Sequence, residues 1–226
     1  MKILDINYYP NLLDHLKLTS SEVCSIIASY TLSFPQVRND KAEWRIAFPM
    51  FLTPFYKYVY NNNSVLNQNN FYDYYLSENK TFFDANKFDA EILEGLKARI
   101  YRTYPSLVRD LHFSLFVNEK IEEAQIVYNR KLDVEEGIDL LIKLKDILYA
   151  INLFTDTARA HIGREKKVSR HTPFDNVQYV ELPVNFKGSF KCQFPQFYLD
   201  SHIQAMSQLT TKEKTKFAEM KRASWP

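Results

Sequence analysis

The segment ILYAINLF, residues 147–154, constrains the fold more than any other part of the chain. Its side chains are apolar on both faces, which is typical of a strand buried in the middle of a sheet. Three further extended segments accompany it: AQIVYN from residue 124, GIDLLIKL from residue 137 and VQYVELPVNF from residue 177. We therefore expect a sheet that contains these four segments, with a short hairpin between the second and the third.

The sequence before residue 124 has the spacing of helices. A T-S-S-E box makes Thr19 or Ser20 the expected N-cap of a first helix. Further along, Pro105 is expected to begin a new helix, because proline is favoured in a first turn. The apolar residues on either side of this proline recur every four positions: Phe88, Ile92, Leu96 and Ile100 before it, and Leu107, Leu111 and Leu115 after it. Arg109 and Asp110 lie off that apolar stripe.

These patterns predict a protein of the α/β (α+β) class. We expect a helical N-terminal part over residues 1–103, packed on an α/β core over residues 104–226 that ends in a helix. The two parts are expected to form one compact unit, because 226 residues with 46% hydrophobic content suffice for a sizeable core.

Composition excludes several classes of protein. Only 4 glycines occur, and no glycine-rich phosphate loop is present. The histidines and the two cysteines lack the spacing of zinc sites, and no G-x-S-x-G motif is found. The first residues contain acids and a proline, and no stretch approaches the roughly 18 apolar residues of a membrane span. We expect a cytoplasmic protein with no membrane partner.

Asp139 is the first candidate functional residue. It follows Ile138 and precedes a run of three aliphatic residues, where a carboxylate is costly unless something compensates its charge. A bound metal ion is one compensation. The alternatives are that Asp139 points out of the other face of the sheet or bonds a neighbouring backbone amide.

A basic stretch follows the third extended segment. The sequence TDTARAHIGREKKVSRH carries five lysines and arginines against one glutamate after its TDT motif. Hydroxyl groups at a strand end followed by cations are typical of phosphate binding, although a run of charge is often only a solvated surface. The polar and cationic residues concerned are Thr157, Arg159, Arg164, Lys166, Lys167, Arg170 and His171.

The order helix, strand, acid-bearing GID segment, buried strand and basic segment over residues 104–182 resembles the PD-(D/E)xK superfamily, the restriction-endonuclease-like nucleases. This resemblance implies a fold of that type and a magnesium (or manganese) site. It also implies that Asp139 is the metal-binding aspartate, with Asp110, Glu119 or Glu122 as the helical acid.

The chain departs from that superfamily at its second motif. Where the superfamily has an acid, any residue and a lysine, this sequence reads TDTAR, which places Thr155 and Thr157 at the corresponding positions. In one interpretation Asp156 or the two hydroxyls complete the metal shell, and Lys166 or Lys167 supports the attacking water. In the other, the fold has lost cleavage and retains phosphate binding.

The leading hypothesis is a metal-dependent nucleic-acid phosphodiesterase, a DNA endonuclease that is expected to act on DNA as its partner and to form a homodimer. Arg159 or Arg170 would stabilise charge in the transition state, and Arg164 and His171 would join them in binding the nucleic acid. A non-catalytic nucleic-acid- or protein-binding module with the same fold is the alternative. A third hypothesis is a partner-docking protein that uses the aromatic segment FPMFLTPFYKYVY.

Overall fold

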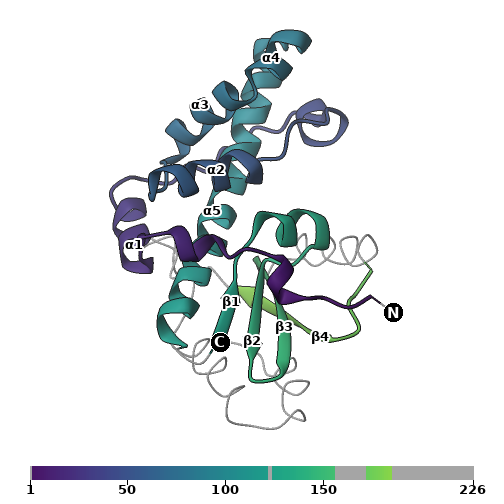
Figure 1. The fold of residues 1–226 in the computed structure, drawn as a ribbon. Helices are drawn as coiled ribbons and strands as arrows, with labels where there is room; N and C mark the ends of the chain where they lie inside the picture. The colour runs from purple at the N-terminus through teal and green to yellow at the C-terminus, as the bar shows by residue number, and fades with distance from the viewer. Residues whose placement is uncertain (1, 122–123, 156–171, 185–226) are drawn as a thin grey trace. The chain divides into compact units, whose positions relative to one another are not determined.

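A computed structural model describes residues 2–121, 124–155 and 172–184, and of these the side chains of Thr155 and residues 182–184 are not described (Figure 1). The chain divides into two compact units. The helical unit is Leu16–Arg109. The sheet unit combines Met1–His15 with the chain from Asp110 onward, so the N-terminal residues belong with the sheet.

The sheet has four strands, in the order of the sequence: β1 (Ala124–Val127), β2 (Leu140–Leu144), β3 (Ile147–Thr155) and β4 (Val177–Val184). The first three strands are antiparallel neighbours, and β4 pairs with β3 in parallel. The four predicted strands and the central place of ILYAINLF are confirmed, as is the mixed α+β class. The hairpin between β2 and β3 turns at Lys145, whose φ is 53°.

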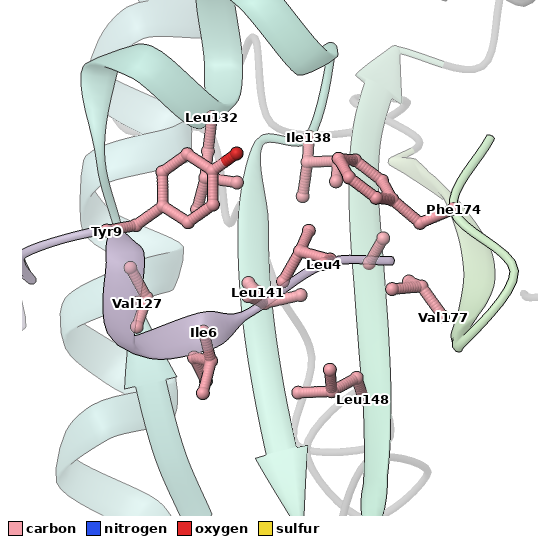
Figure 2. Packing of buried hydrophobic residues seen from close by; sticks show 11 residues of the cluster. Leu4, Ile6, Tyr9, Val127, Leu132, Ile138, Leu141, Leu148, Phe174 and Val177 are labelled. Atoms are coloured by element: carbon pink, nitrogen blue, oxygen red, sulfur yellow. The ribbon is translucent and has the colours of Figure 1, made fainter. Parts of the chain in front are cut away.

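One face of the sheet is covered by the N-terminal segment. Leu4, Ile6 and Tyr9 pack there against Leu141 of β2 and Leu148 of β3 (Figure 2). The rest of this cluster comes from β1, β3, β4 and the segments before β2 and β4: Val127, Leu132, Ile138, Ala150, Phe174 and Val177. A 3-10 turn at Ile6–Tyr8 brings the first apolar side chains onto the sheet.

Hydrogen bonds fix this segment to the turn before β4. The amide of Lys2 donates to the carboxylate of Asp175 at 2.7 Å, and the amide of Asp175 donates back to the Lys2 carbonyl at 2.8 Å. Leu4 and Asn176 exchange a similar pair of bonds at 2.9 and 2.8 Å. The segment therefore behaves as an additional layer of the sheet unit, which the local pattern of the sequence did not predict.

The helical unit contains α1 (Ser20–Ala28), α2 (Leu52–Asn62), α3 (Gln68–Glu78), α4 (Lys80–Asn86) and the first part of α5 (Ala90–Lys120). Thr19 is the N-cap of α1, and its capping box with Glu22 is present, as predicted. None of the helices in the described ranges is long and apolar enough to cross a bilayer.

The expected helix break at Pro105 is wrong, because α5 continues through this residue. A proline has no N–H, so the carbonyl four residues earlier, that of Tyr101, loses its usual helical donor. The buried side chain of Gln68 supplies the missing donor through its Nε2, at 2.9 Å. Gln68 also forms two hydrogen bonds with the backbone of Ser33. Its Oε1 accepts from the Ser33 amide at 2.6 Å, and its Nε2 donates to the Ser33 carbonyl at 3.0 Å.

The apolar stripe beyond Pro105 is confirmed, since Leu107, Leu111 and Leu115 are all buried. Arg109, expected to lie off the stripe, is nevertheless buried, with 3% of its surface exposed. This part of α5 is thus enclosed on more than one face.

We predict that Gln68→Ala lowers the free energy of unfolding by about 1–3 kcal/mol, because it leaves the buried carbonyl of Tyr101 without its donor. In a Pro105→Ala background the helix regains an N–H for that carbonyl, so the same substitution should cost less. Urea denaturation of the four proteins of this cycle measures the coupling. Equal costs in both backgrounds would show that Gln68 stabilises the protein only through Ser33.

Candidate functional site

Asp139 is the residue immediately before β2, which begins at Leu140, so it lies just outside the strand. A short π-helical segment, Leu132–Glu136, ends at Gly137, whose φ of 70° is costly for any other residue. Ile138 then donates its amide to the Leu132 carbonyl at 3.0 Å and buries its side chain. This turn delivers Asp139 to the end of the sheet, where only 6% of its surface is exposed.

The carboxylate of Asp139 completes the pairing between β2 and β3. Its Oδ2 accepts a hydrogen bond from the amide of Leu153 at 2.6 Å. Since β2 begins at Leu140, which pairs with Ile151, this oxygen takes the place of a backbone acceptor beyond the end of the strand. One of the two alternatives to a metal site at Asp139, a hydrogen bond to a neighbouring backbone amide, is therefore observed.

Two further polar side chains lie at this end of the sheet, and neither was predicted from the sequence. Asn152 of β3 is opposite Glu181 of β4, and its Nδ2 lies 3.4 Å from Glu181 Oε1. Asn152 is 4% exposed. Each of the two is a polar residue within a mainly apolar strand. Only the parallel register of β3 and β4 shows that they lie opposite each other.

Asp139, immediately before β2, thus joins Asn152 of β3 and Glu181 of β4 at one end of the sheet. Neighbouring strands are about 4.8 Å apart, so the backbones of Asp139 and Glu181 are separated by roughly 10 Å with Asn152 between them. The set offers two carboxylates and an amide oxygen, which are the hard ligands that magnesium prefers.

Thr155, a predicted site residue, is the last residue of β3 and pairs with Val184. It follows Asn152 by three residues, or about 10 Å along a strand. The pairing of β2 with β3 ends at Leu140 and Ile151, so Asn152 is the first residue of β3 beyond that pairing and Thr155 is the fourth. The role of Thr155 stays a prediction. The other predicted residues of this region lie outside the described residues: Asp156, Thr157, Arg159, Arg164, Lys166, Lys167, Arg170 and His171.

The predicted helical acids Asp110 and Glu119 both lie in α5. Asp110 is half-buried and Glu119 is exposed. Across the described ranges, no three histidine, cysteine, aspartate or glutamate side chains gather into a group that could hold a metal ion. Asp139, Asp110 and Glu119 therefore do not form such a group by themselves, and Asp156 and Glu122 fall outside the described residues.

His112 is a buried titratable group in the same helix. Burial lowers its pKa to about 4, against the smaller opposing effect of the Glu119 charge. Its ring stacks on Phe116 with the centroids 6.0 Å apart. His112 is therefore neutral at pH 7 and adds no cation for phosphate binding.

Comparison with known proteins extends the resemblance beyond the sheet. Residues 1–188 match the model of the TaqI restriction endonuclease family, so the match includes the whole helical unit and all four strands. No curated protein and no solved structure matches the chain. Because the match spans most of the 226 residues, the chain belongs to the TaqI restriction endonuclease family, within the restriction-endonuclease-like nucleases.

Proposed function

We propose that this protein is a metal-dependent endonuclease that hydrolyses phosphodiester bonds of DNA at the end of the sheet marked by Asp139. Membership of a restriction endonuclease family supports DNA as the substrate. The observation that carries the proposal is the nearly buried carboxylate of Asp139, which precedes β2 and bonds to Leu153 of β3, with the polar pair of Asn152 and Glu181 on β3 and β4.

The donor set fits magnesium or manganese. Asp139, Glu181 and the amide oxygen of Asn152 would hold the ion, with further oxygen ligands expected from Asp156 or the hydroxyls of Thr155 and Thr157. Such an ion lowers the pKa of a bound water and offsets charge on the phosphate. The hydrogen bond from Leu153 fixes the orientation of the Asp139 carboxylate before any substrate arrives.

The basic segment after β3 supplies the remaining roles in this proposal. Lys166 or Lys167 would hold the attacking water next to the phosphate. The other cations of the segment, with His171, would bind the DNA backbone on either side of the cleaved bond: Arg159, Arg164 and Arg170.

The second candidate function is DNA binding without cleavage. Two observations favour it: the Asp139 carboxylate already has a structural bond to Leu153, and the sequence TDTAR lacks an acid and a lysine two residues apart. Incubation of the purified protein with plasmid, single-stranded DNA and RNA, with magnesium, manganese or chelator, separates the two functions.

Two substitutions of Asp139 should separate chemistry from folding. Asp139→Asn keeps an oxygen for the Leu153 amide but removes the charge that holds a cation, so we expect cleavage to fall at least about 100-fold with little loss of stability. Asp139→Ala also loses the acceptor and should cost about 1–3 kcal/mol in the free energy of unfolding.

Asp146→Asn, at an exposed position in the hairpin turn, is the matched control and should change neither quantity. Cleavage by Asp139→Asn at the rate of the parent protein would remove Asp139 from the mechanism.

The basic segment is tested by replacing Lys166, Lys167 and Arg170 together with glutamine. Each phosphate contact releases about one counterion, so the slope of log affinity against log salt should become shallower by up to about three. A control triple variant, Lys57→Gln with Lys80→Gln and Lys87→Gln, removes the same charge from exposed positions of the helical unit. Equal slopes of log affinity against log salt for the two triple variants would indicate that the basic segment is only a solvated surface.

A further inference from the structure

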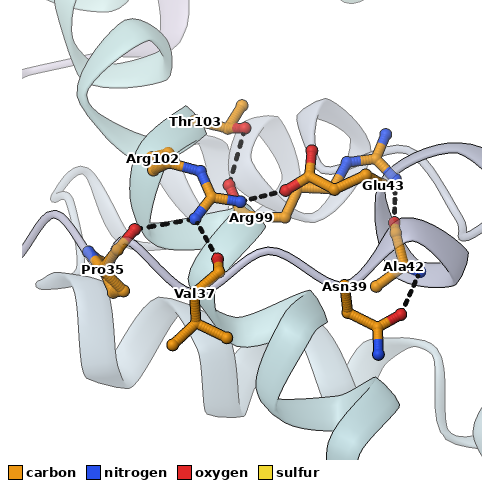
Figure 3. Close-up of polar contacts among 8 residues, drawn as sticks. All are labelled: Pro35, Val37, Asn39, Ala42, Glu43, Arg99, Arg102 and Thr103. Atoms are coloured by element: carbon orange, nitrogen blue, oxygen red, sulfur yellow. Dashed lines mark hydrogen bonds and ion pairs between the residues drawn. The ribbon is translucent and has the colours of Figure 1, made fainter.

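Residues 33–46 of the helical unit form a long connection that α5 holds in one conformation. Two arginines of α5 supply the contacts (Figure 3). Arg102 donates through Nη1 to the carbonyls of Pro35 and Val37, both at 2.8 Å, and its Nη2 pairs with the carboxylate of Glu43. Arg99 donates to the carbonyl of Ala42 at 2.8 Å.

The same connection is fixed at two more places. Gln68 holds Ser33 at its start, as described above, and the side chain of Asn39 accepts from the Ala42 amide at 3.0 Å. Gly95 of α5 lies directly beneath, and a Cβ there would come within 2.5 Å of the Asn39 Cβ and 3.1 Å of the Ala42 Cβ. Only glycine allows this close approach of the connection to the helix.

Three apolar side chains of this ordered connection are exposed. Trp44 lies on its π-helical part, Lys41–Arg45, and is 74% exposed, the most exposed of the large hydrophobic side chains in the described part of the chain. Phe34 and Val37 are 40% and 47% exposed. Six hydrogen bonds to its backbone and the ion pair of Glu43 with Arg102 order this segment, although its own side chains contribute little to the core, whereas a connecting loop is ordinarily more mobile.

The charges beside these residues are mainly positive. Arg38, Lys41 and Arg45 are exposed, and Asp40 is the one acid exposed among residues 33–46. Glu43 does not offset them at the surface, because its side chain is 7% exposed and is paired with Arg102. The result is an exposed tryptophan with three exposed cations within six residues of it in the sequence, all on a preorganised backbone.

Resting on the proposed function, we propose that this surface, residues Phe34, Val37, Arg38, Lys41, Trp44 and Arg45, is a second DNA-contact site outside the sheet unit. The three cations fit the phosphates of a duplex, and the indole of Trp44 fits against a deoxyribose or an exposed base. The three positive charges favour a polyanion as the partner over an apolar protein surface. Because the connection is already ordered, it loses little conformational entropy on binding. The family match over the whole helical unit is consistent with a shared role for it.

The test measures binding of the full chain to a fluorescently labelled DNA duplex in chelator, where cleavage does not occur. Trp44→Ala should weaken binding about tenfold, and Arg38→Gln with Lys41→Gln and Arg45→Gln should reduce the salt slope by up to about three. The matched controls are Tyr60→Ala, another exposed aromatic residue of the helical unit, and the triple variant of Lys57, Lys80 and Lys87. Both controls should bind as the parent does, apart from a small shared effect of net charge.

Two further measurements connect the effect to this surface. In a Trp225→Phe protein, Trp44 is the only tryptophan, and its fluorescence should be quenched when unlabelled duplex is added. Gly95→Ala, which pushes Asn39 and Ala42 outward without altering an exposed side chain, should weaken binding as well. With magnesium present, the Trp44 and triple variants should raise KM while leaving kcat unchanged.

The outcomes separate this inference from the proposed function. If the parent cleaves DNA and the Trp44 and triple variants bind as tightly as the parent, the second contact site is wrong and the nuclease stands. If those variants bind DNA normally but change the sedimentation of the protein, the surface is a protein contact and the inference is overturned. A parent that neither binds duplex in chelator nor cleaves it with magnesium or manganese would overturn both proposals.

Discussion

A carboxylate with almost no access to solvent joins the fold of the sheet unit to its chemistry. Placing Asp139 among aliphatic side chains is costly, and the amide of Leu153 offsets part of that cost. The same bond joins the chain before β2 to β3 beyond their last backbone pair, Leu140 with Ile151, and fixes the direction of the carboxylate. This hydrogen bond has two effects: it stabilises the charge of Asp139 within the fold, and it limits the directions in which the carboxylate oxygens can point.

The elements that the sequence predicted depend on short-range patterns. The capping box at Thr19 involves residues three positions apart, and each strand was visible as a run of extended, apolar residues. The central position of β3 followed from its two apolar faces. In these cases the local pattern and the packing favour the same structure, so the sequence alone was sufficient.

The features that it did not predict depend on distant partners. Pro105 remains inside a helix because Gln68, 37 positions earlier, supplies a donor to Tyr101, and no local rule contains that contact. The place of Asn152 beside Glu181 depends on the parallel register of β3 and β4. Thr155 and Thr157 came from the motif of the resemblance, and their roles stay predictions, because the side chain of Thr155 and all of Thr157 lie outside the described structure. The roles of the basic segment remain predictions, because its residues lie outside those that the structure describes.

The hydrogen bonds between Leu4 and Asn176 join residues 172 positions apart and impose an order on folding during synthesis. A ribosome adds roughly 5–20 residues per second, so Leu4 waits about 10–30 seconds before Asn176 exists. The helical unit is one continuous stretch, Leu16–Arg109, and all of its residues are present well before that moment. For most of this interval, until β2 and β3 have been made, Leu4, Ile6 and Tyr9 have no strands to pack on, and a chaperone that binds short apolar segments would find them accessible.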